Sequence, residues 1–570
     1  MTATFGDERR ETVLAAGGNL LDAMRGMGLY VPALCGGRGA CGKCRIRAMD
    51  GALDVTETDA AHISRGDLDA GWRLACAARP TSDAAVEVAP RGEDNFAVVE
   101  DYSGAIRGAA AITTLVAMEK SPRRVTDRVK MDGDVPLSME TLRGCSEIVE
   151  NGASEVFVTR AGGRILRVGS RTDLFAIAAD IGTTTLCMAL VDVRDGAVLG
   201  RLSMINKQRE YGADVISRIH RAANGDLAAI GDAVRVQLAR GAQKICSDNG
   251  VDPGAVVRMA VVGNTAMLHL LLGLSCKTLG AYPFTPVTLD ALYLRYDEIF
   301  EGPLRCAVEV LPGISTYVGA DITAGILFTN LPESERPALL LDMGTNGEMA
   351  VSRDGRLCCT ATAAGPAFEG GNIEWGTGSV PGAISSVRFD GGETRIETIG
   401  GTPPTGICGS GVIDAVAACL KSGIISGTGR FEKDFEDGVS LGLTERGREI
   451  RFTQRDVREV QLAKSAVRSG IDILLKIAGL SYGDVGAFYI AGGFGYRIGF
   501  DSGVAIGLFP EEFSGRMTAV GNSALGGAIK YLLDESAGGA LEAIARGAEH
   551  FDLSEDGAFN DMFMENMMFP

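Results

Sequence analysis

The segment ALCGGRGACGKCRI, residues 33–46, places three cysteines within ten residues, and a fourth follows in LACAARP. The spacing is C-x5-C-x2-C-x31-C, with ligand candidates Cys35, Cys41, Cys44 and Cys76. Mostly small residues separate the first three thiols. A loop that wraps an inorganic cluster needs them, because it must aim thiolates inward and bring backbone N–H groups close to sulfur. Three thiols on one tight loop and a fourth from a distant element predict a [2Fe–2S] cluster.

Structural zinc is the main alternative for these thiols. Zinc sites favour two separated CxxC pairs, whereas this chain has one such pair. Disulfides are a weaker alternative, because nothing else in the chain indicates secretion. We expect the remaining cysteines to be buried and reduced; they are Cys145, Cys187, Cys246, Cys276, Cys306, Cys358, Cys359, Cys408 and Cys419.

The cysteine spacing resembles that of the ferredoxin family over residues 1–95, closer to the adrenodoxin-like branch than to plant-type ferredoxins. The resemblance implies a β-grasp fold and one-electron chemistry. Within this region the pattern predicts a helix over residues 12–31, ended by Pro32, and a closing strand in VEVAP. The loop is flanked by a basic edge that is either solvated or a docking rim for an acidic redox partner, formed by Arg38, Lys43, Arg45 and Arg47.

Composition limits the classes of function. The length of 570 residues predicts several domains, and 46% hydrophobic with 22% charged residues is typical of globular proteins. The net charge of −18 disfavours binding to nucleic acid or to anionic membranes. No apolar run reaches the roughly 18 residues of a membrane span, and the polar N-terminus MTATFGDERRE does not resemble a signal peptide. We therefore expect a cytoplasmic protein.

The segment over residues 96–172 predicts a linker and a small middle domain. It contains a helix over Met139–Asn151 and a hairpin in EVFVTRAGGRILRV that turns at Gly162 and Gly163. We find no candidate chemistry in this segment.

The remainder of the chain contains an internal repeat. Residues 176–196 read AIAADIGTTTLCMALVDVRDG, and residues 337–355 read PALLLDMGTNGEMAVSRDG. Each copy is an apolar strand, then Asp-x-Gly-Thr, then a second apolar strand that ends in Asp-Gly. The repeat predicts two homologous α/β halves over residues 173–336 and 337–570.

The Asp-x-Gly-Thr turns are typical of phosphate binding. A glycine at the bend lets backbone N–H groups face an anion, and hydroxyl donors come from Thr183, Thr184, Thr185 and Thr345. Asp180 and Asp342 need a cation between themselves and a phosphate, which implies Mg²⁺. One such turn occurs in many β-hairpins, but two copies in opposite halves indicate a nucleotide site.

Further glycine-rich turns fit this prediction. AGGFG at residues 491–495 follows the strand AFYI, where the backbone can closely approach a base or ribose. VGNTAMLHLL at residues 262–271 and VGNSALGGA at residues 520–528 form a second matched pair. Each reads as a strand end, a turn and a helix start, which suits connections between two hinged lobes.

This set of motifs resembles the ASKHA superfamily of actin, sugar kinases and Hsp70 chaperones. The resemblance implies that ATP is clamped between two lobes. The first phosphate hairpin would contain Asp180, Gly182, Thr183, Thr184 and Thr185, the second Asp342, Gly344, Thr345 and Asn346, and the adenosine turn Gly492 and Gly493. Asp321 in GADITAG is where an acidic water-orienting residue is expected, although a helix-initiating aspartate gives the same pattern.

The order of the parts resembles reductive activators of corrinoid-dependent enzymes. The resemblance rests on GICGSGVID (406–414), AGPAFEGGNI (364–373), AGGFG and the terminal MMFP. It implies a multidomain α+β and α/β fold. The parts are a β-grasp ferredoxin-like domain (1–95), a small middle α/β domain with linker (96–172) and a duplicated actin-like, ribonuclease H-like ATPase core (173–570).

The implied activity is that of an ATP-hydrolysing metalloprotein reductase. A [2Fe–2S] cluster, reduced by a low-potential donor, would pass an electron to the Co(II) corrinoid of a partner protein in a methyltransferase system and regenerate Co(I). A homodimer is also implied. Two alternatives stay open: a redox-sensing ATPase regulated by the cluster, and an actin- or Hsp70-like scaffold with an appended ferredoxin module. We expect the four histidines to be structural and the tail DMFMENMMFP to cover a core edge.

Overall fold

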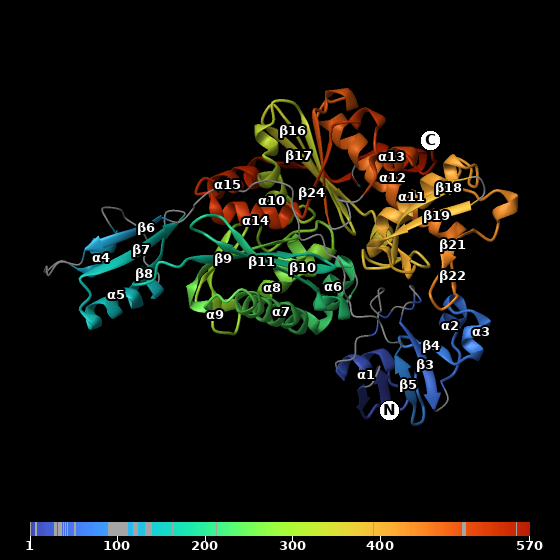
Figure 1. Ribbon diagram of the computed structural model, residues 1–570, viewed down its shortest axis with the longest axis horizontal. Coiled ribbons are helices and arrows are strands. Elements are labelled where there is room, and N and C mark those ends of the chain that lie inside the picture. The colour runs from blue at the N-terminus through green and yellow to red at the C-terminus, as the bar shows by residue number, and fades with distance from the viewer. Residues whose placement is uncertain are drawn as a thin grey trace. The chain divides into compact units, whose positions relative to one another are not determined.

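The computed structural model describes most of the chain (Figure 1). The described residues are 2–5, 8–27, 31, 37, 39, 42, 44–50, 53–88, 112–117, 124–130, 139–161, 164–212, 214–390, 393–492, 498–553 and 556–570. Within these ranges, no helix is long and apolar enough to cross a membrane.

The N-terminal region forms a mixed five-stranded sheet in the order β2-β1-β5-β3-β4. Its strands are β1 (Thr2–Phe5), β2 (Glu8–Glu11), β3 (Arg45–Asp50), β4 (Trp72–Leu74) and β5 (Ala85–Val88), with helices α1 (Leu20–Gly26), α2 (Glu57–His62) and α3 (Arg65–Asp69). The central β1 and β5 are parallel and their outer neighbours antiparallel. Leu20, Leu21 and Met24 of α1 are buried with Ile46 and Leu74 of the sheet. The expected β-grasp fold and closing strand are confirmed.

The helix predicted over residues 12–31 is wrong in extent, because α1 begins only at Leu20. Gly17 has φ of +77°, in the left-handed region that interrupts a helix, and its N–H donates to Pro80 O (2.8 Å). Asn19 then accepts from Asp22 N (3.3 Å), which fixes the helix start. The predicted stop at Pro32 lies outside the described residues.

The middle region is an antiparallel sheet in the order β6-β7-β8 with two helices. It comprises β6 (Ile112–Ala117), β7 (Glu155–Ala161), β8 (Arg164–Gly169), α4 (Val125–Lys130) and α5 (Met139–Asn151). The predicted helix and the two hairpin strands are confirmed, although the Gly162 and Gly163 turn lies outside the described residues. Helix α5 packs directly on β8. The approach is so close that a Cβ at Gly144 would lie 2.4 Å from Val168 O.

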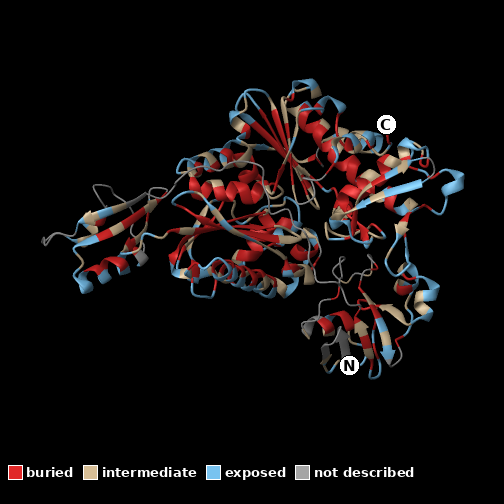
Figure 2. Cartoon of the chain, in the orientation of Figure 1, coloured by how far each residue is buried: buried red, intermediate tan, exposed pale blue. Residues whose placement is uncertain are grey.

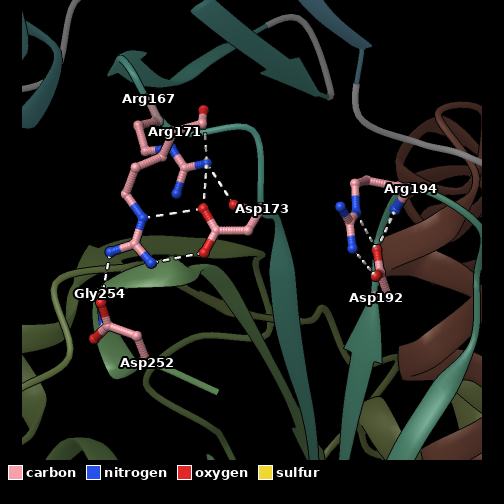
Figure 3. Close-up of polar contacts among 7 residues, drawn as sticks. All are labelled: Arg167, Arg171, Asp173, Asp192, Arg194, Asp252 and Gly254. Atoms are coloured by element: carbon pink, nitrogen blue, oxygen red, sulfur yellow. Dashed lines mark hydrogen bonds and ion pairs between the residues drawn. The ribbon is translucent and has the colours of Figure 1, made fainter. Parts of the chain in front are cut away.

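The junction after this sheet is fastened by ion pairs (Figure 3). Arg171 donates to both carboxylate oxygens of Asp173 (3.0 and 2.6 Å) and to Asp252 Oδ2 (2.6 Å). Arg167 also donates to the Asp173 carbonyl. The hydrogen bond from Arg171 holds the pKa of Asp173 below its ordinary value. The chain therefore enters the next sheet at a fixed position.

The last two thirds of the chain contain two six-stranded sheets with the same core topology. The first has the order β11-β10-β9-β12-β14-β13 and the second β24-β23-β15-β16-β17-β25. The first sheet contains β9 (Phe175–Ile181), β10 (Thr185–Asp192), β11 (Val198–Ile205), β12 (Val256–Gly263), β13 (Leu292–Arg295) and β14 (Ala307–Val310). The second contains β15 (Ala338–Met343), β16 (Gly347–Arg353), β17 (Arg356–Thr362), β23 (Ala487–Ala491), β24 (Met517–Gly521) and β25 (Glu549–His550).

Strands β11-β10-β9-β12-β14 correspond in order to β17-β16-β15-β23-β24. In both sheets the Asp-x-Gly-Thr hairpin is antiparallel, and its first strand is parallel to the next strand, β12 or β23. The expected duplication is confirmed.

Helices α10 (Ala320–Thr329) and α14 (Ser523–Leu533) join the two halves (Figure 1). Helix α10 follows the first sheet but contacts β15 and β16, and α14 follows the second sheet but contacts β9 and β12. The helices approach very closely, because a Cβ at Gly527 would lie 2.0 Å from Ala324 O. Both helices are largely buried (Figure 2).

Additional elements extend both halves. The first half contains α6 (Val215–Arg221), α7 (Leu227–Asp248), α8 (Thr265–Leu272) and α9 (Tyr296–Ile299). The second contains β18 (Ala383–Asp390), β19 (Glu393–Thr398), β20 (Gly406–Ile407), β21 (Val439–Leu443), β22 (Glu449–Phe452), α11 (Gly409–Lys421), α12 (Gln454–Ile477), α13 (Phe500–Ala505), α15 (Ala537–Gly547) and α16 (Gly557–Glu565).

The C-terminal tail packs along α12. Gln461 Nε2 donates to Met567 O (2.7 Å), Lys464 Nζ donates to Met568 O (2.5 Å), and Phe569 is buried in the core of the second half. The expectation that the tail covers a core edge is confirmed.

Candidate functional site

The two Asp-x-Gly-Thr turns face one cavity of about 130 Å³. Asp180 and Asp342 are each the penultimate residue of their strand, β9 or β15. The structure brings the following predicted residues to this cavity: Asp180, Gly182, Thr183, Thr184, Thr185, Asp321, Asp342, Gly344, Thr345, Asn346 and Gly492. Gly493 lies outside the described residues.

Two asparagine amides hold the first hairpin. Asn522 Nδ2 donates to Asp180 Oδ2 (2.9 Å), and Asn264 Nδ2 donates to Thr183 Oγ1 (3.2 Å). Each asparagine also begins a helix, because its Oδ1 accepts from Leu525 N (2.8 Å) or Met267 N (3.0 Å). The matched VGN segments are strand–turn–helix connections as predicted, but their amide contacts to the hairpin were not anticipated.

Carboxylates surround the second hairpin. Glu348 faces Asp342 across the β15–β16 ladder, and its Oε1 accepts from Asn346 Nδ2 (3.2 Å). Glu369 Oε2 accepts from Thr345 Oγ1 (2.8 Å). Sequence reasoning missed both glutamates. Strand pairing across a short hairpin could have identified Glu348, whereas Glu369 belongs to AGPAFEGGNI, which had no assigned role.

Asp321 lies at the start of α10, one residue after the helix begins. Its Oδ1 accepts from Ile322 N (2.9 Å), and the residue lines the cavity with Asp180 and Asp342. Asp321 therefore faces the cavity from the first turn of α10, and it does not cap that helix, because the N-cap residue is Gly319.

The crowded carboxyls of the cavity have raised pKa values. Burial raises the pKa of Asp342 to about 8, and the charges of Asp321, Asp180 and Glu369 contribute. Burial raises the pKa of Asp180 to about 7, although the Asn522 hydrogen bond opposes this shift. Burial also raises the pKa of Asp321 to about 6 and that of Glu348 well above its ordinary value. Carboxyls with raised pKa values retain protons at higher pH, and a cation bound among them would displace those protons.

Glycine is needed at three positions of the cavity for different reasons. A Cβ at Gly182 would lie 2.7 Å from Thr185 O, and one at Gly492, where φ is +100°, would lie 2.3 Å from Met343 O. At Gly344 the nearest atoms to a Cβ would be 3.9 Å away, on Asn346 and Glu369. The neighbouring chain requires glycine at 182 and 492, whereas at 344 the glycine keeps the cavity open.

The N-terminal loop has the backbone expected of a cluster cradle. Cys44 and Cys76 are buried, and Cys35 and Cys41 lie outside the described residues. A Cβ at Gly37 would lie 3.9 Å from Cys76 Cβ. Gly37, Gly39 and Gly42 have φ of +91°, +78° and +62°, which favours glycine at each position. The described part of this loop therefore fits a cluster bound by cysteines of the loop and by Cys76.

His62 of α2 supports that loop. Its Nε2 lies 2.9 Å from Gly39 O, and a Cβ at Gly42 would lie 2.8 Å from His62 Cβ. Arg45, one of the predicted basic edge residues, donates to His62 O (2.9 Å). Arg47 donates to Ala70 O (3.2 Å), and the other two basic residues lie outside the described part of the chain.

Three family models match successive segments of the chain. A "2Fe-2S iron-sulfur cluster binding domain" matches residues 4–81, the "RACo middle region" matches residues 175–334, and the "C-terminal domain of RACo the ASKHA domain" matches residues 336–570.

Similar proteins cover nearly the whole chain. The corrinoid activation enzyme RamQ of Eubacterium limosum is 32% identical over 585 residues, which cover 96% of this chain and 95% of that protein. A [Co(II) methylated amine-specific corrinoid protein] reductase of Methanosarcina barkeri is 27% identical over 427 residues, which cover 69% of this chain and 76% of that protein. The solved structure of a reductive activator for corrinoid, iron–sulfur protein has 29% identity and a TM-score of 0.73, and the match covers 100% of this chain and 98% of that one.

Proposed function

Because the chain belongs to the family of corrinoid activation enzymes, we propose that it reductively activates a corrinoid protein in an ATP-dependent reaction. The electron passes to the Co(II) corrinoid of a partner methyl carrier and regenerates Co(I). One observation carries this proposal: a single chain combines a cysteine loop of the [2Fe–2S] type with a cavity between two phosphate-type hairpins. Similarity to a reductase favours electron delivery over redox sensing or scaffolding.

On the electron-transfer side, we assign the cluster to Cys35, Cys41, Cys44 and Cys76. The bound cluster supplies a one-electron carrier. The loop glycines Gly37, Gly39 and Gly42 would let the backbone approach it, and the His62 ring contacts the Gly39 carbonyl. Support for this assignment comes from the matched cluster-binding domain and the positive φ values of the loop glycines.

On the nucleotide side, we assign the phosphates of ATP to residues 182–185 and 344–346, with the adenosine near Gly492 and Gly493. Asp180, Asp321 and Asp342 would act with Mg²⁺ in hydrolysis. Mg²⁺ usually binds through one or two carboxylates together with substrate phosphates, and Asp180, Asp321 and Asp342 all line the cavity beside the two turns. The raised pKa values of the cavity carboxylates also favour a cation in their midst.

We infer the need for ATP from the potentials of the two redox centres. A plant-type cluster has a potential near about −400 mV, and each 100 mV uphill costs roughly 2.3 kcal/mol per electron. Reduction of Co(II) to Co(I) lies at very low potential, so a cluster alone leaves little Co(I). Closure of the two halves around ATP would change the contacts with the corrinoid partner. Hydrolysis would then return the protein to its open conformation.

The domain boundaries, the electron donor, the oligomeric state and the location complete the proposal. The separate sheets β1–β5 and β6–β8 support domains at 1–95, 96–172 and 173–570. A low-potential electron donor, a possible homodimer and a cytoplasmic location follow from the family resemblance and the sequence.

Variants of the two sites test the proposal. We expect Asp342→Asn and Gly344→Ala to abolish ATP-dependent Co(I) formation while the reduced-cluster electron paramagnetic resonance spectrum stays intact. Cys76→Ser should lose the cluster and retain ATP binding. Gly539→Ala in α15, where a Cβ meets no atom within 4 Å, is the matched control for Gly344→Ala. Full activity of both Asp342→Asn and Gly344→Ala would contradict the proposal.

A further inference from the structure

Two acidic residues of the cavity come from neither hairpin: Asp321 lies on α10, and Glu369 lies on a separate segment. Glu369 ends a short 3₁₀ turn, Pro366–Glu369, inside AGPAFEGGNI. Its Oε2 accepts the Thr345 hydroxyl proton (2.8 Å), and its Oε1 lies 3.9 Å from the position of a Cβ at Gly344. Glu369 therefore faces the turn of the second hairpin, where the terminal phosphate of the proposed nucleotide would lie.

The segment that carries Glu369 forms a tight turn with its own backbone hydrogen bonds. Gly365 and Gly370 both have φ of +77°. Gly371 N donates to Pro366 O (2.8 Å), and a Cβ at Gly376 would lie 1.9 Å from Gly370 O. This backbone leaves little freedom for the position of the Glu369 side chain.

Helix α12 anchors the same segment. Asn372 is a non-glycine residue with φ of +62°, and its Nδ2 donates to Glu459 Oε2 (3.0 Å). Glu374 N donates to the buried Asp456 (2.8 Å). Strained backbone persists where the surroundings determine it, and it clusters at functional sites. The anchoring thus places one carboxylate in the cavity at an energetic cost.

The other cavity carboxylates have different contacts. Asp180 accepts from Asn522, and Asp321 accepts from its own helix at Ile322 N. Glu348 lies in the ladder beside Asp342 and accepts from Asn346. Glu369 accepts from the Thr345 hydroxyl, on the turn where the terminal phosphate would lie. A carboxylate within reach of the attacking water is the arrangement that a general base requires.

We propose that Glu369 is the general base of nucleotide hydrolysis, with Thr345 as its positioning residue; this inference rests on the proposed ATP site. The oxygen of a water molecule forms a bond to the terminal phosphorus, and the bond from that phosphorus to the bridging oxygen breaks. The electron pair leaves with the diphosphate, and the water proton passes to the Glu369 carboxylate. The products are ADP and inorganic phosphate.

The test compares Glu369→Gln, Thr345→Val and the control Glu374→Gln in the full-length, cluster-loaded protein. Glu374 is exposed in the same segment and does not line the cavity. Titration calorimetry with MgATP measures binding, and single-turnover hydrolysis of MgATP measures the chemical step. The pH dependence of hydrolysis is recorded for each variant.

We expect Glu369→Gln to bind MgATP as tightly as the unmodified protein while hydrolysis falls about 100-fold, a typical contribution of a general base. The acid limb of its pH profile should disappear. In Thr345→Val that limb should persist while the hydrolysis rate falls, because the carboxylate is still present but has lost the hydrogen bond that positions it. Glu374→Gln should hydrolyse ATP normally.

Hydrolysis within about threefold of normal in Glu369→Gln would overturn the inference, because a general base contributes far more. Loss of MgATP binding in that variant with an unchanged melting temperature would also overturn it, because Glu369 would then be a binding residue. Failure of the unmodified protein to bind MgATP would instead overturn the proposed nucleotide site itself.

Discussion

The two Asp-x-Gly-Thr hairpins share a backbone and differ in their surroundings. In the first, Asp180 faces Cys187 across the ladder and accepts from the Asn522 amide. In the second, Asp342 faces Glu348, and no hydrogen bond of its carboxylate is recorded among the described residues. The duplication therefore preserved strand order while the contacts of the two turns diverged. We infer that both turns contact phosphate and that the second, with more carboxylates around it, contributes more to the chemical step.

The largest expected effect separates the two aspartates. We expect Asp342→Asn to slow MgATP hydrolysis by about 100-fold or more and Asp180→Asn by about tenfold, because removal of electrostatic groups at the reacting centre costs most. Steady-state kinetics at varied Mg²⁺ concentration measures this difference. An equal loss of hydrolysis rate in the two variants would mean that the two hairpins contribute equally, and it would contradict the difference inferred here.

The second prediction concerns pH and stability. Both carboxyls have pKa values raised above the ordinary 3.8, to about 8 for Asp342 and about 7 for Asp180. Above about pH 4 the folded protein holds protons that the unfolded chain has released. The contribution of the two carboxyls to the free energy of unfolding is therefore complete below about pH 4 and is lost as the pH rises through 7 to 8.

Melting temperatures of the nucleotide-free protein between pH 5.5 and 8.5 test this second prediction. Asp342→Asn should become progressively more stable than the unmodified protein as the pH rises, and the advantage should extend to higher pH than that of Asp180→Asn. Each pKa unit corresponds to roughly 1.4 kcal/mol. A pH-independent difference for both variants would contradict the assigned direction of the shifts.

The smallest expected effect distinguishes the two asparagines. Asn522→Ala and Asn264→Ala each remove a helix cap, which costs about 1 kcal/mol of stability. Only Asn522 donates to Asp180, and this hydrogen bond lowers the pKa of that carboxyl. Asn522→Ala should therefore steepen the loss of stability between pH 6 and 8, with Asn264→Ala as the matched control. The same steepening in both variants would show that the amide contact does not control Asp180.

Local patterns predicted much of the fold and part of the cavity. Strand alternation and the repeated Asp-x-Gly-Thr identified both hairpins, because a tight turn and its strands lie within one short segment. The helix over residues 12–31 was predicted too long, because a contact from Gly17 to the distant Pro80 interrupts it. Helical periodicity carries no signal of such a contact.

Long-range contacts explain the cavity residues that the sequence did not reveal. Asn522 lies 342 positions from Asp180, and Glu369 lies 24 positions from Thr345. These pairs form only because α14 crosses to the first sheet and because α12 anchors the Glu369 segment. Glu348 could have been predicted from the sequence, because strand pairing across the short hairpin places it opposite Asp342. The roles of the predicted cluster, phosphate and catalytic residues all stay predictions, and Cys35, Cys41 and Gly493 also lie outside the described residues.

The central claim is that ATP drives an unfavourable electron transfer to cobalt. The most direct measurement mixes the dithionite-reduced full-length protein with a Co(II) corrinoid protein of a methyltransferase system and follows Co(I) by its absorbance. We expect Co(I) to accumulate with MgATP and to stay at a small fraction without it. The same yield of Co(I) in the absence of nucleotide would contradict the account.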